Sequence, residues 1–351
     1  MTEPSSRPRS PRSHRRPSLA DVAAAAGVAP ITASRVANGS VNVDARTRDR
    51  VLTAMRDLGY RPNVAARALA TGRFDSIGVV TSSLGSHGNA ATVDAINEAA
   101  AARGCSLTLM RAGDARAEDV EQAIDRLAHL GVDGIVVLAE QRLLGGRLPD
   151  LPDGVPYVFV DSGVPADLPV VDADQRDGAR LATRHLLELG HRTVHHVGGP
   201  ESSAAAAARG QSWEQTLRDD GLTPPALVRG DWSSLSGIRL AAEVAGLVAA
   251  GDLTAVFAAN DQMALGLIHG LDELGIRVPE QVSIVGFDDI PDAEAYLPAL
   301  TTIRQRFDRV GTIAVEQLLR QVEDPGLEPA RTLVPVELVI RSSTAPPPGS
   351  R

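Results

Sequence analysis

Polar side chains follow several strand-like apolar runs of this 351-residue chain, at the point where each run ends. In open sheets of parallel strands, ligands bind beyond the carboxyl ends of the strands, so these side chains should share one crevice. They are Thr81, Ser82, Asp161, Asn260, Asp261, Asp288 and Asp289. Carboxylates and amides accept hydrogen bonds from vicinal hydroxyls, and Trp232 can stack on the apolar face of a sugar ring. The pattern favours a neutral, polyhydroxylated ligand, although each Asp taken singly could instead cap the following helix.

Other chemistries fit the sequence less well. Two of these acids could hydrolyse a glycosidic bond if their carboxyl groups lay about 5 to 9 Å apart. His191, His195 and His196 lie close together, but no second cluster with zinc spacing accompanies them, so we expect no metal site. The sequence has no Walker or dinucleotide-binding glycine motif, and we therefore expect no cofactor.

Strands that alternate with helices must position these side chains. The strand-like runs are at residues 77–80, 107–110, 135–138, 157–160, 194–197, 255–258 and 282–286. Most of them are separated by helical stretches, which is the signature of β–α–β units in parallel sheets. The sequence after residue 74 therefore predicts an α/β fold, and its length fits two doubly wound, Rossmann-like lobes better than one.

The segment 19–38 predicts two short helices joined by a tight turn. Ser18 and Asp21 match a capping box at the start of the first helix, and Gly27 can end it. Pro30 suits the first turn of the second helix because its missing N–H would be unpaired there anyway. Such a pair is a helix-turn-helix whose second helix can lie in the major groove of DNA. An ordinary Ala-rich helical hairpin is the alternative.

A third helix and a very short fourth helix complete the predicted N-terminal head. Asp44 can cap the third helix, and Gly59 can end it. Asn63 can cap a hinge helix that Gly72 must stop, which leaves only about two turns. So short a helix is marginal in water, so it should fold only against a partner such as a symmetry mate and DNA.

Charge is divided unevenly along the chain. Residues 1–73 contain 13 arginines and five acids, whereas the remainder contains 22 basic and 39 acidic residues. A basic head on an acidic body indicates that only the head meets a polyanion.

The sequence favours a cytoplasmic protein. Cys105 is the single cysteine and cannot form an internal disulfide. No apolar run approaches the roughly 18 residues of a membrane span, and the N-terminus lacks the apolar core of a signal peptide. We therefore expect no membrane as a partner.

These patterns divide the chain into five parts. We predict a disordered basic tail at 1–17, the helix-turn-helix domain at 18–62, the hinge helix at 63–73, a core at 74–341 and a disordered tail at 342–351. Within the core we expect an N-lobe of about 75–172 and 305–325, and a C-lobe of about 173–302 and 328–341.

Motifs over nearly all of residues 18–341 resemble those of the lactose-repressor family of bacterial transcription regulators. The head has L-A-D-V-A, S-R-V-A-N, T-R-D-R-V and G-Y-R-P-N-x-x-A-R-x-L, and the body has S-I-G-V-V, D-G-I-V-V, V-G-G-P, A-N-D-Q-M-A-L-G, V-S-I-V-G-F-D-D and P-A-L-T-T-I-R-Q. The resemblance implies lobes of the periplasmic-binding-protein type. It also implies a repressor of carbohydrate-utilisation genes that binds double-stranded operator DNA and is released by a sugar effector.

The resemblance assigns DNA contacts to the head and the hinge. Pro30 and Ile31 occupy the family's two main base-reading positions, and Leu69 matches the hinge leucine that wedges between bases in the minor groove. The matching positions are Pro30, Ile31, Thr32, Ser34, Arg35, Asn38, Thr47, Tyr60, Asn63, Ala66 and Leu69.

The resemblance also assigns the effector site. The residues that match those holding the family's sugar are Asp161, Arg209, Trp232, Asn260 and Asp288, with Ser82 and Gln305 as further lining. The main positions all keep side chains suited to a carbohydrate. We therefore expect a sugar rather than a purine, which the family also uses.

Several positions depart from the family pattern. Ala29 replaces the usual Ser or Thr before the reading helix, which removes a cap worth about 1 kcal/mol. Pro30 and Ile31 offer no hydrogen bonds to base edges, so readout there would be apolar, for example against thymine methyl groups. Ser86 and Ala173 replace larger apolar residues, which predicts a wider or more polar pocket. The sequence has no heptad helix of the kind that makes tetramers in the family, so we expect a homodimer.

Two other classes of protein remain as alternatives. An exported sugar-binding protein would share the two-lobed body, but the missing signal segment and the basic head disfavour it. A glycoside hydrolase would use two of the cleft acids. We expect a regulator and not an enzyme.

Overall fold

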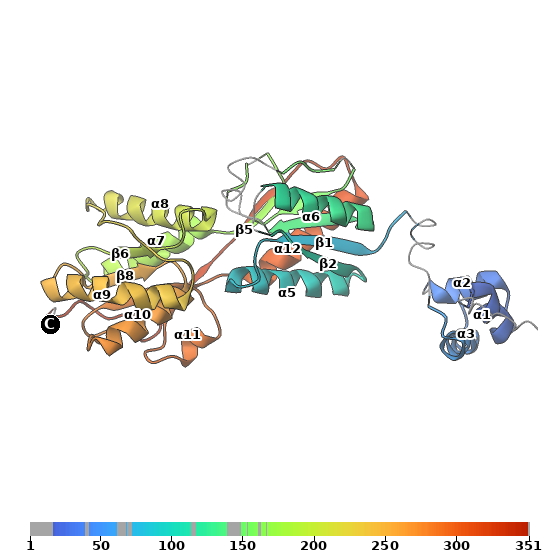
Figure 1. Ribbon diagram of the computed structural model, residues 1–351, viewed down its shortest axis with the longest axis horizontal. Helices are drawn as coiled ribbons and strands as arrows, with labels where there is room; N and C mark the ends of the chain where they lie inside the picture. The colour runs from blue at the N-terminus through green and yellow to red at the C-terminus, as the bar shows by residue number, and fades with distance from the viewer. Residues whose placement is uncertain are drawn as a thin grey trace, which may run out of the picture. The chain divides into compact units, whose positions relative to one another are not determined.

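The structure is a computed structural model that describes residues 17–38, 42–61, 68, 72–113, 117–138, 149–152, 154–160, 163–165 and 167–349. The chain divides into two compact units, Met1–Phe74 and Asp75–Arg351. The described residues of the first unit form the helices α1, α2 and α3, and those of the second form two β-sheets with their covering helices (Figure 1).

The first unit is the predicted helix-turn-helix head. Its helices are α1 (Leu19–Ala26), α2 (Pro30–Ala37) and α3 (Ala45–Leu58). Ser18 and Asp21 form the capping box of α1, and Gly27 ends that helix in the left-handed conformation at φ 61°. The chain bends by 108° between α1 and α2. Ala29 precedes α2 without a side-chain cap, whereas Asp44 caps α3.

A small apolar core joins the three helices. It consists of Val22, Ala23, Ala26, Ala33, Val36, Val51, Ala54 and Met55. The Arg50 guanidinium donates to the carbonyls of Ala26 and Gly27, the latter at 3.1 Å, and so ties α3 to the end of α1. Ala33 and Val36 place the inner face of α2 in this core, and the opposite face of the helix is exposed.

The second unit contains two six-stranded sheets. The first sheet has the order β2-β1-β3-β4-β5-β11, with all paired strands parallel. Its strands are β1 (Ser76–Thr81), β2 (Ser106–Arg111), β3 (Gly134–Leu138), β4 (Tyr157–Phe159), β5 (Val170–Ala173) and β11 (Arg331–Val334). We call the part built on this sheet the N-lobe.

The second sheet has the order β7-β6-β8-β9-β10-β12 and is parallel except for β12. Its strands are β6 (His195–Gly198), β7 (Val228–Arg229), β8 (Ala255–Ala258), β9 (Ser283–Asp288), β10 (Thr301–Arg304) and β12 (Glu337–Val339). We call the part built on this sheet the C-lobe. The two doubly wound lobes confirm the predicted fold class.

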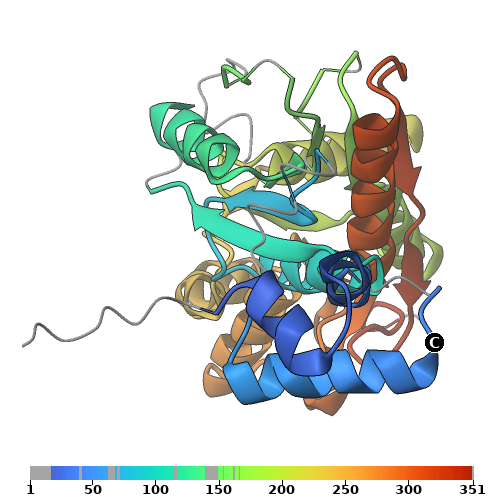
Figure 2. The same ribbon diagram turned by 90° about the vertical axis from the view of Figure 1, so that its right-hand side faces the viewer.

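Helices cover both faces of each sheet. In the N-lobe, α5 (His87–Ala102) and α12 (Phe307–Glu323) lie opposite α6 (Ala117–Leu130), with the sheet between them (Figure 2). Successive side chains of β1 point to opposite faces of the sheet. Val79 packs with Ile96 of α5 on one face, and Val80 packs with Ile124 of α6 on the other.

In the C-lobe, two pairs of helices enclose the sheet. The pair on one face is α7 (Gln175–Glu188) and α8 (Ala204–Asp219), and the pair on the other is α9 (Ser234–Ala250) and α10 (Asp261–Glu273) (Figure 1). The short α11 (Asp292–Ala295) follows β9. Within the described residues, no single helix combines the length and apolar composition that a membrane span needs, although α1 and α2 do so jointly across their bend.

The chain crosses between the lobes three times. It leaves the N-lobe after β5 to form α7, returns after β10 to form α12, and crosses again between β11 and β12. The carboxyl ends of both parallel sheets therefore face a common region beside these crossings, where the topology predicts a ligand.

The C-terminal segments correct two expectations about the domains. We assigned residues 328–341 to the C-lobe, but β11 pairs in parallel with β5 and so extends the N-lobe sheet. We expected 342–351 to be disordered, yet Ser343 is fully buried. Its hydroxyl accepts from the Thr301 N–H at 2.8 Å and donates to the Ile284 carbonyl at 2.6 Å. Composition suggested a loose end because it could not show that these polar groups satisfy strand groups of the C-lobe.

Candidate functional site

A cleft of about 610 Å³ lies between the lobes at the carboxyl ends of their strands. This volume is typical of small-molecule sites. Six residues of the predicted effector set line it: Ser82, Arg209, Trp232, Asn260, Asp288 and Gln305. Asp161 lies outside the described residues. Ser86 and Ala173, where we expected a wider or more polar pocket, also line the cleft.

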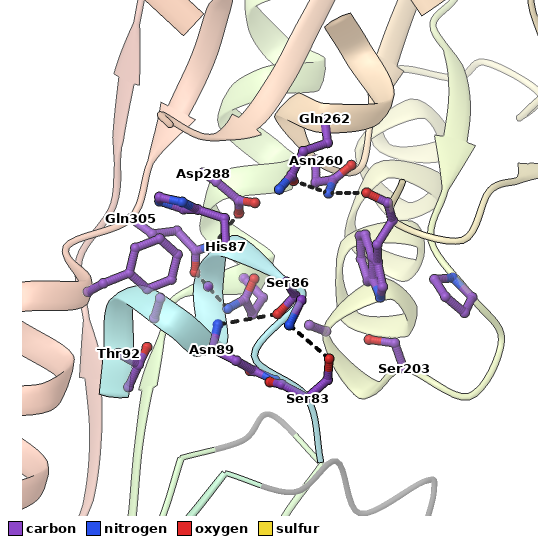
Figure 3. Close-up of a pocket in the computed structure, with 18 of the residues that line it drawn as sticks. Ser83, Ser86, His87, Asn89, Thr92, Ser203, Asn260, Gln262, Asp288 and Gln305 are labelled. Atoms are coloured by element: carbon purple, nitrogen blue, oxygen red, sulfur yellow. Dashed lines mark hydrogen bonds between the residues drawn. The ribbon is translucent and has the colours of Figure 1, made fainter. Parts of the chain in front are cut away.

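Asn260 joins two walls of the cleft on the C-lobe side. It follows β8 and caps α10, because its Oδ1 accepts from the Met263 N–H at 3.0 Å. Its Nδ2 donates to the backbone carbonyl of Trp232 at 3.0 Å and to Gln262 Oε1 at 2.6 Å (Figure 3). The loop that carries the indole is thereby fixed to the end of the sheet.

Trp232 is held in a strained conformation. Its φ is 72°, a left-handed value that costs a non-glycine residue about 1 to 3 kcal/mol. A Cβ atom at Gly199 would lie 2.4 Å from the indole ring, so the ring rests directly on the glycine backbone. Asp231 fixes the same loop by accepting from the Ser233 hydroxyl and from the Ser233 N–H, the latter at 3.0 Å. These hydrogen bonds lower the pKa of Asp231 to about 2, so it stays charged.

Asp288 and Arg209 place opposite charges in the buried floor of the cleft. The closest approach is 3.8 Å, between Arg209 Nη2 and Asp288 Oδ1, and Gln305 Nε2 donates to the same oxygen at 2.6 Å (Figure 3). Burial raises the pKa of Asp288, while the charge of Arg209 and the bond from Gln305 oppose the rise. The Arg209 guanidinium also lies 3.8 Å above the ring centroid of Phe287.

The N-lobe wall of the cleft is different in kind. Its described polar side chains come mainly from the turn after β1 and the first turns of α5: Ser82, Ser83, Ser86, His87, Asn89 and Thr92. Ser86 caps α5 by accepting from the Asn89 N–H at 3.3 Å, and the Asn89 amide donates to the Ser83 carbonyl at 2.9 Å (Figure 3). Most of these groups are small and partly exposed, and the described carboxylate on this wall is the buried Asp172 of β5.

Three side chains that we expected in the crevice have structural roles instead. The Thr81 hydroxyl donates to the Ser83 carbonyl at 3.2 Å. Asp261 accepts from the Ile290 N–H at 2.9 Å and from the Thr302 hydroxyl, and burial together with Asp288 raises its pKa well above the ordinary value.

Asp289 is the third of these side chains, and it pairs with Arg304 at 2.6 Å and Arg341 at 2.7 Å. The expectation that polar residues after strands line the cleft was therefore wrong where such a residue forms hydrogen bonds or ion pairs with a neighbouring strand or segment.

Sequence reasoning missed Asp172 and Gln175, which also line the cleft. Both are at most 8% exposed, and Gln175 is the first residue of α7. The signal was available, because they end and follow β5. That strand has only four residues, and we did not identify it as a strand.

The predicted DNA-contacting residues of the head lie on or near the open side of α2. Pro30, Ile31 and Arg35 are exposed, and the Ile31 side chain is 62% exposed. Asn38 is exposed and donates to the Ser34 hydroxyl at 3.5 Å.

The remaining predicted contacts divide into two groups. Thr32, Thr47 and Tyr60 are partly buried, and Tyr60 packs against the head core. Asn63, Ala66 and Leu69 lie outside the described residues, as does most of the predicted hinge helix. Within the described part of the chain, no group of three or more His, Cys, Asp or Glu side chains is arranged to hold a metal ion.

Comparison with protein families gives two matches. Bacterial regulatory proteins of the lacI family match residues 18–63, and the periplasmic binding protein-like domain matches residues 183–344. The chain is also 35% identical to the lactose operon repressor of Escherichia coli (strain K12), over 94% of this chain and 91% of that protein.

Two solved structures are similar over most of the chain. The lac repressor dimer bound to operator and the anti-inducer ONPF has a TM-score of 0.81 at 34% identity, covering 94% of this chain and 100% of that chain. The complex of the transcriptional regulator CelR with cellobiose has a TM-score of 0.69 at 33% identity, covering 93% of this chain and 100% of that chain.

Proposed function

The chain belongs to the lacI family of bacterial regulatory proteins, and we propose that it represses carbohydrate-utilisation genes by binding operator DNA as a homodimer. A sugar effector bound in the cleft relieves that repression. The observation that carries the proposal is that six side chains between Ser82 and Gln305 in sequence meet in one cleft.

The chemistry of the cleft suits a neutral sugar. Arg209 donates and Asp288 accepts, while Asn260 Oδ1 keeps a second lone pair that can accept, so vicinal hydroxyls find partners of each kind. Trp232 offers an aromatic face for the apolar side of a pyranose ring. The structure of a relative, CelR, contains cellobiose, which is a sugar of this kind.

The effector acts by changing the relation between the lobes. A sugar that contacts both walls binds best at one lobe angle, and its differential affinity for the two states sets how far DNA affinity falls. We propose that residues 63–73 carry this change to the head as a hinge helix, with Leu69 as a minor-groove wedge.

The head reads DNA through the open face of α2. The exposed Ile31 has no hydrogen-bonding group, so it favours contact with a thymine methyl group in the major groove. Ser34, Arg35 and Asn38 supply polar contacts around it.

We further propose that the protein is a regulator without catalytic activity and that it acts in the cytoplasm, where bacterial DNA lies. The relatives are transcription regulators, whereas an exported sugar-binding protein or a hydrolase would leave the head without a role.

The test combines DNA and sugar binding in one preparation. The full chain is titrated against labelled duplex DNA from the promoter region of its own gene, at roughly 50 and 200 mM salt. We expect specific binding that weakens with salt, and at least one sugar of a panel that includes cellobiose and lactose should weaken it about tenfold or more. The same sugar should raise the melting temperature, because it binds only the folded state.

Each part of the proposal can fail separately. Salt-independent or absent DNA binding would contradict the repressor. A panel without any thermal shift would contradict the sugar effector, and release of free monosaccharide from a bound glycoside would contradict a role without catalysis.

A further inference from the structure

Four buried polar side chains form a closed ring at the floor of the cleft. They are Gln175, Arg209, Asp288 and Gln305, each 5% to 7% exposed. They come from four places in the C-lobe and its crossings: the start of α7, the middle of α8, the end of β9 and the segment between β10 and α12. We call this set the polar ring.

The contacts of the polar ring run in one direction. Arg209 Nε donates to Gln175 Oε1 at 2.8 Å, and Gln175 Nε2 donates to Gln305 Oε1 at 3.0 Å. Gln305 Nε2 donates to Asp288 Oδ1 at 2.6 Å, and that oxygen lies 3.8 Å from Arg209 Nη2. Gln175 Nε2 also donates to Asp172 at 3.3 Å, which uses its second hydrogen.

The charged ends fix the orientation of both amides. An arginine only donates, so Gln175 must turn its oxygen toward Arg209 and its nitrogen toward Gln305. An ionised carboxylate only accepts, so Gln305 must turn its nitrogen toward Asp288 and its oxygen toward Gln175. Both ends demand the same arrangement, and neither amide can flip without placing like groups together.

We infer that Gln175, which is hydrogen-bonded to both Arg209 and Gln305 in the polar ring, is a positioning residue for the effector site. It holds the guanidinium of Arg209 and the amide of Gln305 in the orientations in which they meet the sugar. The part that concerns the sugar rests on the proposed function.

The polar ring also joins the ligand to the lobe crossings. Gln175 begins the segment that follows the crossing after β5, and Gln305 lies in the crossing after β10. A ligand that shifts Arg209 or Asp288 therefore displaces Gln175 and Gln305, and with them two of the three connections between the lobes. The bonded contacts supply a physical route from occupancy of the cleft to lobe angle.

The first experiment replaces Gln175 with methionine, which keeps the length of the side chain and removes its hydrogen bonds. The matched control is Gln211→Met, because Gln211 Oε1 accepts from the neighbouring Arg176 at 2.8 Å on the exposed surface. We expect Gln175→Met to lower the melting temperature by about 5 °C or more, since it leaves buried groups unsatisfied, and the control to change it by about 1 °C or less.

Cellobiose is the binding probe, and promoter DNA reports the integrity of the head. Gln175→Met should weaken cellobiose binding about tenfold or more, whereas Gln211→Met should bind cellobiose like the wild type and keep its sugar-free DNA affinity within about twofold. Equal cellobiose affinity in Gln175→Met and the wild type would overturn the positioning role. A wild type that does not bind cellobiose would count against this sugar as the effector. The melting temperatures of the ring variants would then decide whether the ring acts as a unit.

The second experiment tests the direction of the ring without any ligand. Gln305→Glu places a second carboxylate against Asp288 and should lower the melting temperature strongly. Adding Asp288→Asn moves the charge along the ring, because the new amide at position 288 donates to the new carboxylate at position 305, which still accepts from Gln175. We expect the double variant to recover at least half of the loss. No recovery, or equal stability of Gln175→Met and Gln211→Met, would show that the ring does not act as a unit.

Discussion

The two lobes share one strand order but furnish the cleft differently. Each sheet places its strands in the same pattern, β2-β1-β3-β4-β5-β11 in the N-lobe and β7-β6-β8-β9-β10-β12 in the C-lobe. The C-lobe wall contributes a buried guanidinium paired with a buried carboxylate, whereas the described N-lobe wall contributes mainly hydroxyl and amide groups, together with the imidazole of His87 and the carboxylate of Asp172. The shared fold therefore fixes where the polar groups meet, whereas the burial and hydrogen bonding of these groups differ between the lobes.

This difference predicts unequal consequences of substitution. A buried, hydrogen-bonded group has already lost its hydration. Removing its partner therefore leaves it unsatisfied and lowers the free energy of unfolding. A partly exposed hydroxyl returns to water when its partner is removed. We therefore expect the C-lobe wall to set both stability and affinity, and the N-lobe wall to adjust them.

The largest effect should come from Arg209→Met. It removes the positive partner of Asp288 in the buried floor, and breaking a buried pair in this way costs about 3 to 5 kcal/mol. Affinity for the effector sugar should fall about 10- to 100-fold, the worth of a hydrogen bond to a charged group. Urea denaturation and calorimetric titration measure the two quantities.

The control for that prediction is Arg239→Met. Arg239 pairs with Asp231 at 2.8 Å, but both side chains are more than half exposed. Exposed pairs contribute about 0 to 1 kcal/mol, so stability should barely change. Similar losses in the two variants would remove the distinction between buried and exposed groups on which the comparison depends.

A pH effect should also be confined to the C-lobe. Burial lowers the pKa of His196 to about 4, and the charges of Arg209 and Arg229 add to the effect. The unfolded chain takes up this proton near pH 6.5 and the folded chain only near pH 4. Stability that is present above pH 6.5 is therefore lost as the pH falls to 4, by up to about 3 kcal/mol.

His196→Asn tests this expectation. Asparagine keeps a donor for the Phe257 carbonyl, which His196 Nδ1 contacts at 2.8 Å, and it cannot titrate. Urea midpoints between pH 6.5 and 4 should vary less in this variant than in the wild type. His269→Asn, on the exposed surface of α10, should keep the wild-type pH dependence. An unchanged slope in His196→Asn would assign the acid sensitivity elsewhere, for example to His185, His191 and His195, whose pKa values burial also lowers.

The same contrast explains what the sequence could predict. The apolar runs found seven strands, including the three-residue β4, and capping residues such as Ser18 and Asp44 marked the starts of the head helices. β7 was missed because it has only two residues, and β5 was missed because Asp172 interrupts its apolar run. Gln175, which follows β5, was missed together with that strand.

Side-chain partners were the second limit. Asn260 and Asp261 are adjacent and both follow β8, yet one lines the cleft and the other is buried against Thr302 and Ile290. No local pattern separates them, since the difference lies in β10 and the segment after β9. The resemblance to a family named the residue that lines the cleft, because such likeness carries information about three-dimensional neighbours.

A third prediction compares two glycines beside the cleft. Gly199→Ala would place a Cβ atom 2.4 Å from the Trp232 ring and must displace it, whereas Gly85→Ala meets only the Ser83 hydroxyl at 3.3 Å. We expect Gly199→Ala to cost about 1 to 3 kcal/mol and to weaken sugar binding about tenfold, because the stacking surface moves. Tryptophan fluorescence and calorimetry measure the displacement and the affinity. Gly85→Ala should leave both nearly unchanged, and a reversed order would place the specificity in the N-lobe.

The smallest effect should come from one chemical change made in each lobe. Ser86 and Ser203 both cap a helix at the cleft, and their hydroxyls accept from the Asn89 N–H at 3.3 Å and the Ala206 N–H at 3.2 Å. Ser203 is 1% exposed, whereas Ser86 is partly exposed. Ser86→Ala should cost about 0.5 to 1 kcal/mol, since water replaces the lost cap, and Ser203→Ala about 1 to 2 kcal/mol, since the Ala206 N–H stays dry. Sugar affinity should change less than about threefold in Ser86→Ala, because neighbouring hydroxyls remain on that wall. If the two variants are equally stable by urea denaturation, burial does not distinguish the walls, and the shared strand order alone accounts for the site.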